Sequence, residues 1–72
     1  MSVFTYIDLV TEKGELVRIE CPSKHEDELY DSICNAMKRG DWWSVNQFEG
    51  CRAEFMGRPM DRIAMNKIMG ML

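Results

Sequence analysis

The sequence predicts a small α+β domain in which two antiparallel β-hairpins flank one helix, in the order ββαββ. Three observations predict this fold: alternating apolar residues on both sides of Gly14, a helical apolar stripe between residues 23 and 40, and a second alternating run after Cys51. A chain of 72 residues fits one domain, which we expect to span residues 1–72. At this size a single hydrophobic core is only just large enough to stabilise the fold, so we also expect self-association.

Residues 3–21 are predicted to form the first hairpin. The run from Thr11 to Glu15 is a turn sequence, with Gly14 in the left-handed position of a three-residue loop. The resulting register puts three apolar pairs on one face and Asp8 opposite Arg18 on the other; the three pairs are Leu9 with Val17, Ile7 with Ile19 and Thr5 with Cys21. The apolar face should receive the helix. The second face is mixed, because it also carries Phe4, Tyr6, Val10 and Leu16.

The helix is predicted to begin at a capping box formed by Ser23 and Glu26 and to stop at Gly40. Acidic residues fill its first turn and basic residues its last, as the helix dipole favours. An apolar stripe at helical spacing comprises Leu29, Tyr30, Ile33, Cys34, Ala36 and Met37.

Two adjacent tryptophans follow the helix. Neighbouring side chains of an extended segment point in opposite directions, so at most one of Trp42 and Trp43 can enter the core. The other either covers a loop or serves as an exposed anchor of the kind that dominates interface energies.

The last third of the chain predicts the second hairpin. Cys51–Met56 alternates like a strand, and Gly57-Arg58-Pro59 is a turn. Residues 60–64 then favour a strand, residues 65–67 a kink, and residues from Ile68 a final strand. The same apolar residues also fit a C-terminal helix, which would give ββαβα instead. Five of the seven methionines lie between Met56 and Met71, where core filling is the simpler interpretation and an adaptable binding surface the other.

Composition and charge favour some classes of function over others. With 46% hydrophobic and 29% charged residues the chain should fold, and its net charge of −3 argues against a nucleic-acid or membrane-surface role. Three cysteines without a Cys-x-x-Cys pair indicate reduced thiols, and the first residues do not resemble a signal peptide. We therefore expect a cytoplasmic protein without a membrane span.

Candidate chemical sites are weak. Cys21 and His25 could form a nucleophilic pair, or could join another cysteine around zinc, but no orienting residue and no standard ligand spacing accompany them. A cluster of acidic residues could bind a divalent cation, but at the start of a helix the dipole is the simpler explanation for them; they are Glu26, Asp27, Glu28 and Asp31. We expect no catalytic residue, no metal and no cofactor.

The sequence thus favours a small non-enzymatic protein, of regulatory or interaction type, that binds a protein partner of unknown identity and forms a homodimer. The predicted partner-binding residues are Phe4, Tyr6, Val10, Leu16, Trp42 and Trp43. The alternative is a nucleic-acid-binding regulator that uses an exposed tryptophan and dispersed basic residues, namely Lys38, Arg39, Arg52, Arg58, Arg62 and Lys67.

Overall fold

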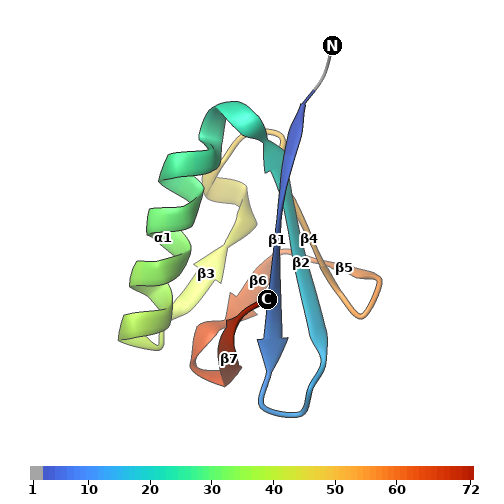
Figure 1. Ribbon diagram of the computed structural model, residues 1–72, viewed down its shortest axis with the longest axis vertical. Helices are drawn as coiled ribbons and strands as arrows, with labels where there is room; N and C mark the ends of the chain where they lie inside the picture. The colour runs from blue at the N-terminus through green and yellow to red at the C-terminus, as the bar shows by residue number, and fades with distance from the viewer. Residues whose placement is uncertain (1–2) are drawn as a thin grey trace.

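The computed structural model describes residues 3–72, which form one helix, seven antiparallel strands and three short 3₁₀ turns (Figure 1). A five-stranded sheet has the order β5-β4-β2-β1-β7, and β3 pairs with β6 in a separate two-stranded ribbon. The strands are β1 (Phe4–Thr11), β2 (Leu16–Pro22), β3 (Trp42–Ser44), β4 (Arg52–Phe55), β5 (Arg58–Met60), β6 (Arg62–Ala64) and β7 (Ile68–Met71). The helix is α1 (Glu26–Arg39), and the 3₁₀ turns are η1 (Ser23–His25), η2 (Val45–Gln47) and η3 (Met65–Lys67).

The α+β class is confirmed, but the chain has more strands than the predicted ββαββ arrangement. The alternative with a C-terminal helix is wrong, because residues 58–71 form β5, β6, η3 and β7. The strands that were not predicted are short. They are β3 and β5, which contain three residues each, too few for an alternating pattern to distinguish a strand from a loop. The second hairpin is also paired differently from the prediction: β4 pairs with β5, which includes Arg58 and Pro59 of the expected turn, whereas β6, within the predicted strand of residues 60–64, pairs with β3.

The register of the first hairpin is confirmed. Leu9 lies opposite Val17, Ile7 opposite Ile19 and Asp8 opposite Arg18. Gly14 has φ +79°, the left-handed conformation that the turn requires, and its N–H donates to the Thr11 carbonyl. The odd-numbered residues of β1 and β2 therefore face the core, while the even-numbered residues of β1 face outward.

The start of the helix differs from the prediction. No side-chain capping bond forms at its first turn, so the capping box is wrong, and α1 begins at Glu26 after the 3₁₀ turn of Ser23–His25. The two residues bond to β1 instead: the Thr5 hydroxyl lies 3.2 Å from Ser23 Oγ and donates to Glu26 Oε1 at 2.9 Å. Tyr30, predicted to lie in the apolar stripe, is exposed. The helix buries Leu29, Ile33 and Ala36 and ends before Gly40 as predicted.

The β3–β6 ribbon has a local two-fold repeat. Each half reads Asp, one variable residue, a buried apolar residue, a small residue, a second buried apolar residue and Asn, starting at Asp41 and again at Asp61. The N–H of Val45 donates to the Asp61 carbonyl at 2.9 Å, and the N–H of Met65 donates to the Asp41 carbonyl at 3.0 Å. The two strands and their 3₁₀ turns are thus held by reciprocal bonds.

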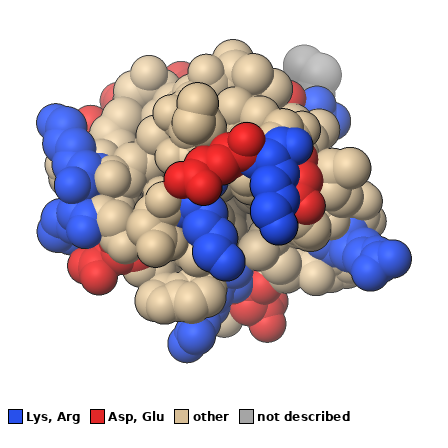
Figure 2. All heavy atoms as spheres, turned by 90° about the horizontal axis from the view of Figure 1, so that it is seen from below, with Lys and Arg blue, Asp and Glu red and all other residues tan. Residues whose placement is uncertain are grey.

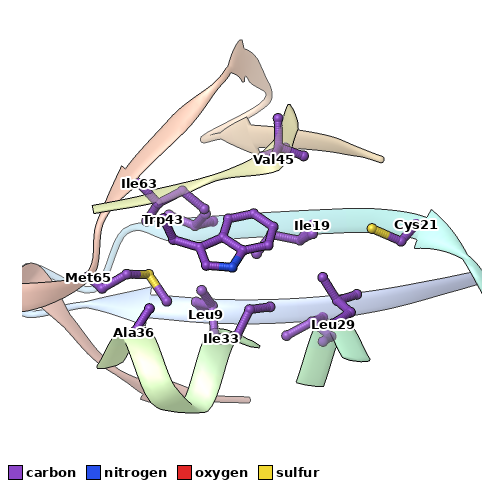
Figure 3. Packing of buried hydrophobic residues seen from close by; sticks show 13 residues of the cluster. Leu9, Ile19, Cys21, Leu29, Ile33, Ala36, Trp43, Val45, Ile63 and Met65 are labelled. Atoms are coloured by element: carbon purple, nitrogen blue, oxygen red, sulfur yellow. The ribbon is translucent and has the colours of Figure 1, made fainter. Parts of the chain in front are cut away.

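The core lies between the inner face of the large sheet, α1 and the ribbon. Figure 3 shows the Trp43 indole between the helix and the strands, with Ile19 and Leu9 close to it. The buried residues come from all three parts: Ile7, Leu9, Val17, Ile19, Cys21, Leu29, Ile33, Ala36, Trp43, Val45, Ala53, Ile63 and Met65.

Two cysteines depart from the prediction of reduced thiols. Cys21 and Cys51 form a disulfide, and only Cys34 is free among the described residues. The pairing follows from the register of β2 and β4, in which Glu20 lies opposite Arg52, so that the next residues outward are Cys21 and Cys51.

Candidate functional site

The two tryptophans have different environments. β3 alternates, so Trp43 points into the core and is 2% exposed, whereas Trp42 points outward and is 62% exposed. The indole N–H of Trp43 donates to Ser32 Oγ at 2.8 Å, and its ring stacks near Phe48 at 6.2 Å. Trp43 is therefore a core residue, and Trp42 is the tryptophan of the pair that a partner can reach.

Trp42 is held by the neighbouring strand. β6 lies beside β3, with Ala64 opposite Trp42, and the guanidinium carbon of Arg62 lies 4.8 Å from the centre of the Trp42 ring. This distance is within the range of a cation–π contact. The exposed indole of Trp42 thus has a basic side chain of the neighbouring strand over its ring.

An apolar groove lies beside Trp42, between the ribbon and the end of the β1–β2 hairpin. We call it the Trp42 groove; its volume is about 420 Å³, and its large apolar lining residues are Val17, Trp42, Phe55, Met60, Ile63 and Ile68. Charged residues of both signs line it as well: Glu12, Lys13, Glu15, Arg62 and Lys67. Figure 2 views this end of the molecule and shows basic and acidic side chains mixed around a hollow. The groove combines an apolar floor with a polar rim, as protein interfaces do.

The other predicted partner-binding residues lie on the outer face of the large sheet. Tyr6 is 57% exposed, Phe4 and Leu16 are less exposed, and Val10 is half-buried. They do not form a continuous apolar patch, because ion pairs separate them. The Asp8 carboxylate accepts two hydrogen bonds from Arg18 at 2.8 and 3.0 Å, and Arg18 also lies 5.6 Å from the Tyr6 ring centre.

These ion pairs alter the acid–base properties of the outer face. The hydrogen bonds from Arg18 lower the pKa of Asp8. Arg52 and, to a smaller extent, Tyr6 lower the pKa of Glu20, and the same contact with Glu20 raises the pKa of the Tyr6 phenol. The face is thus a network of paired charges with two aromatic rings beside it.

The candidate nucleic-acid residues are not gathered on one surface. Arg52 is paired with Glu20 and Arg39 with Asp41. Arg62 and Lys67 do meet at the Trp42 groove, together with Lys13, but Glu12 and Glu15 line the same groove.

The methionine-rich segment is divided between the core and the surface. Met65 is buried, and Met60 and Met71 pack against the core, whereas Met56 and Met69 are 60% and 70% exposed. Core filling thus explains three of the five, and Met60 also lines the Trp42 groove.

The Cys21–His25 pair is not assembled. Cys21 is in the disulfide, and His25 has its Nε2 atom buried without a hydrogen-bond partner among the described residues. Its ring packs against Phe48, with the ring centres 5.6 Å apart. Within residues 3–72, no three His, Cys, Asp or Glu side chains are grouped closely enough to hold a metal ion.

Sequence reasoning missed the Trp42 groove because its six large apolar lining residues come from six different strands, β2 to β7. The one available signal was the repeat beginning at Asp41 and Asp61, which would have paired β3 with β6. The chain matches no family model, and no curated protein or solved structure is significantly similar to it. No helix in residues 3–72 is long and apolar enough to cross a bilayer.

Proposed function

We propose that this chain is a small non-enzymatic protein that acts by binding a protein partner through the Trp42 groove. The observation that carries the proposal is Trp42 itself, a 62% exposed indole that Arg62 holds beside an apolar groove. Covering an indole and an apolar floor removes a large apolar area from water, and tryptophan is among the residues that dominate interface energies. The earlier expectation of a homodimer belongs to the same proposal, because two copies could cover each other's groove.

Site-specific cross-linking tests the groove. A photoreactive side chain at position 42 should cross-link to a protein, either a second copy or another polypeptide, in an extract of the source cells. The matched control is position 69, where Met69 is exposed but lies outside the groove. Products at position 42 that are no stronger than those at position 69 would contradict the proposal.

Light scattering at two protein concentrations separates the two kinds of partner. A dimer that dissociates in Trp42→Ala but persists in Met69→Ala identifies a second copy as the occupant. A monomer at both concentrations removes the homodimer from the proposal and leaves a different protein as the partner.

Nucleic-acid binding is the second candidate, favoured by the contact between Arg62 and Trp42 and by the nearby Lys13 and Lys67. Single-strand binders combine basic grooves with aromatic rings on which bases stack. A labelled single-stranded oligonucleotide whose binding weakens steeply with salt and is lost in Trp42→Ala would favour this candidate over protein binding.

A cytoplasmic location, predicted from the cysteine count, is tested by the Cys21–Cys51 bond. Disulfides persist mainly in oxidising compartments. Trapping of free thiols at the moment of lysis should label all three cysteines if the protein is cytoplasmic, and Cys34 alone if it is not.

A further inference from the structure

A second surface, distinct from the Trp42 groove, lies along the upper half of β1. The edge strand β7 pairs with β1 only at Leu9–Thr11, and the N–H of Leu72 donates to the Asp8 carbonyl. Figure 1 shows β7 beside the lower half of β1, with the C-terminal end near the middle of that strand. Above this point, no strand within residues 3–72 pairs with β1 on its outer edge.

The register identifies which backbone N–H and carbonyl groups on this edge of β1 have no partner strand within residues 3–72. Odd-numbered residues of β1 bond to β2, as the bond from the Ser23 N–H to the Val3 carbonyl shows, so even-numbered residues direct their N–H and carbonyl groups to the opposite edge. Phe4 and Tyr6 therefore each present one N–H and one carbonyl there. Such an edge is a template for another strand.

A groove lies directly beside this edge. It is formed by Thr5, Tyr6 and Ile7 of β1 and by residues from the first turns of α1, which are Glu26, Asp27, Tyr30 and Asp31. Three acidic residues thus line the inner side of the position of an added strand, one of which, Glu26, accepts a hydrogen bond from Thr5, and the exposed residues Phe4 and Tyr6 belong to the outer face of β1. No lysine or arginine lines this groove in the described part of the chain.

We propose that the open edge of β1 binds an extended segment of a partner protein in which basic and apolar residues alternate. The segment adds an antiparallel strand that continues the line of β7. Its basic side chains point inward to Glu26, Asp27 and Asp31, and its apolar side chains point outward to Phe4 and Tyr6. Main-chain hydrogen bonds supply affinity in this mode of recognition, and alternate side chains supply specificity.

A second copy of β1 is a poorer occupant. Antiparallel pairing of two β1 edges around a two-fold axis would bring the acidic first turns of both α1 helices together, and like charges placed close together disfavour a complex. Charge complementarity therefore favours a basic segment over self-pairing. The proposal is independent of the Trp42 groove, since the two surfaces share no residue.

The test uses a labelled synthetic peptide in which lysine and valine alternate, and measures its fluorescence anisotropy with the intact protein. In the antiparallel arrangement, the valine residues lie opposite Phe4 and Tyr6 and direct their N–H groups to β1, whereas lysine N–H groups point away. N-methylation of the valines should abolish binding, and N-methylation of the lysines should leave it unchanged. Equal binding of the valine-methylated and unmodified peptides would overturn the proposal.

Variants of the protein test the same geometry. Tyr6→Pro removes the edge N–H, a change that edge strands tolerate, and should abolish binding; Tyr6→Ala keeps the N–H and should retain most of it. The double variant Asp27→Asn with Asp31→Asn should weaken binding about fivefold, as expected for the loss of two exposed ion pairs. A glutamate–valine peptide should not bind. Binding of the lysine–valine peptide that is unchanged in both Tyr6→Pro and the double variant would overturn the site.

The result is distinguishable from a failure of the proposed function. Trp42→Ala should bind the lysine–valine peptide normally, and Tyr6→Pro should retain the cross-links at position 42. A protein that dimerises through β1 would instead lose its dimer in Tyr6→Pro, and that outcome would assign the edge to a second copy and overturn the peptide proposal.

Discussion

The indole N–H of Trp43 donates to the hydroxyl oxygen of Ser32 at 2.8 Å, and this bond joins β3 to the middle of α1. Trp43 is 2% exposed, so almost none of the side chain is open to water. A serine on the inner side of a helix satisfies the single polar atom that the largest buried side chain brings into the core.

Ser32→Ala should lower the free energy of unfolding by about 1–3 kcal/mol, because it leaves the buried indole N–H without an acceptor. Urea unfolding measures the loss. Asn35→Ala, at an exposed position of the same helix, is the control and should change stability by less than about 0.5 kcal/mol. Equal effects of the two substitutions would show that the bond contributes nothing.

Cys51→Ser should lower the free energy of unfolding by about 3 kcal/mol relative to the oxidised protein, because the disulfide closes a segment with a sequence separation of 30. Reductant should lower the stability of the unmodified protein toward that of the variant. Cys34→Ser keeps the bond and serves as control. If reductant leaves the urea midpoint of the unmodified protein unchanged, the prediction is wrong.

Gly50→Ala should destabilise the protein by about 1–2 kcal/mol, because Gly50 has φ +82° and an added Cβ would lie 3.1 Å from Pro22 Cγ. Gly70→Ala is the matched comparison, since a Cβ there would have nothing within 4 Å and the backbone is not left-handed. We expect Gly70→Ala to be neutral or to stabilise by up to about 1 kcal/mol. Thermal unfolding of both variants checks the contrast, which a similar loss in the two would refute.

Stability should fall as the pH is lowered from about 5 toward 2, because Asp8 and Glu20 have pKa values below their usual values near 4. A lowered pKa in the folded state means that the unfolded chain binds protons more readily. The stabilising contribution of each carboxylate is therefore fully present above the pKa of the unfolded chain, and it is lost as the pH falls through the pKa of the folded protein. Urea midpoints at several pH values should fall less steeply in Asp8→Asn than in Asp31→Asn. Parallel pH profiles for these two variants and the unmodified protein would contradict the assignment.

Local patterns in the sequence predicted the hairpin register and the end of the helix. The residues that determine them lie close together: Gly14 sets the turn, and the alternation of Ile7 and Leu9 with their partners across it sets the faces. The start of the helix was predicted wrongly because Thr5, distant in sequence, bonds to both Ser23 and Glu26 and replaces the local cap.

The pairings between distant segments were not predictable in the same way. The disulfide requires β4 to lie beside β2, which brings Cys51 next to Cys21. The alternation expected around Trp42 and Trp43 predicted that only one of them enters the core, but it did not predict which one. The choice depends on Ser32 as an acceptor for Trp43 and on Arg62 as a neighbour for Trp42.

The pairing of β1 with β7 has a consequence for the chain during its synthesis. Among the described strands, β1 is translated first and β7 last, although the two are hydrogen-bonded neighbours in the sheet. The β1–β2 hairpin can close within microseconds of emerging, since its turn is local. Leu9–Thr11 cannot pair with β7 until residues 68–71 have been synthesised. Until then, every nascent chain carries an uncovered strand edge along the whole of β1. Crowding of nascent chains on one messenger RNA therefore favours strand exchange between copies, and a low expression temperature or chaperone capacity should raise the yield of monodisperse protein.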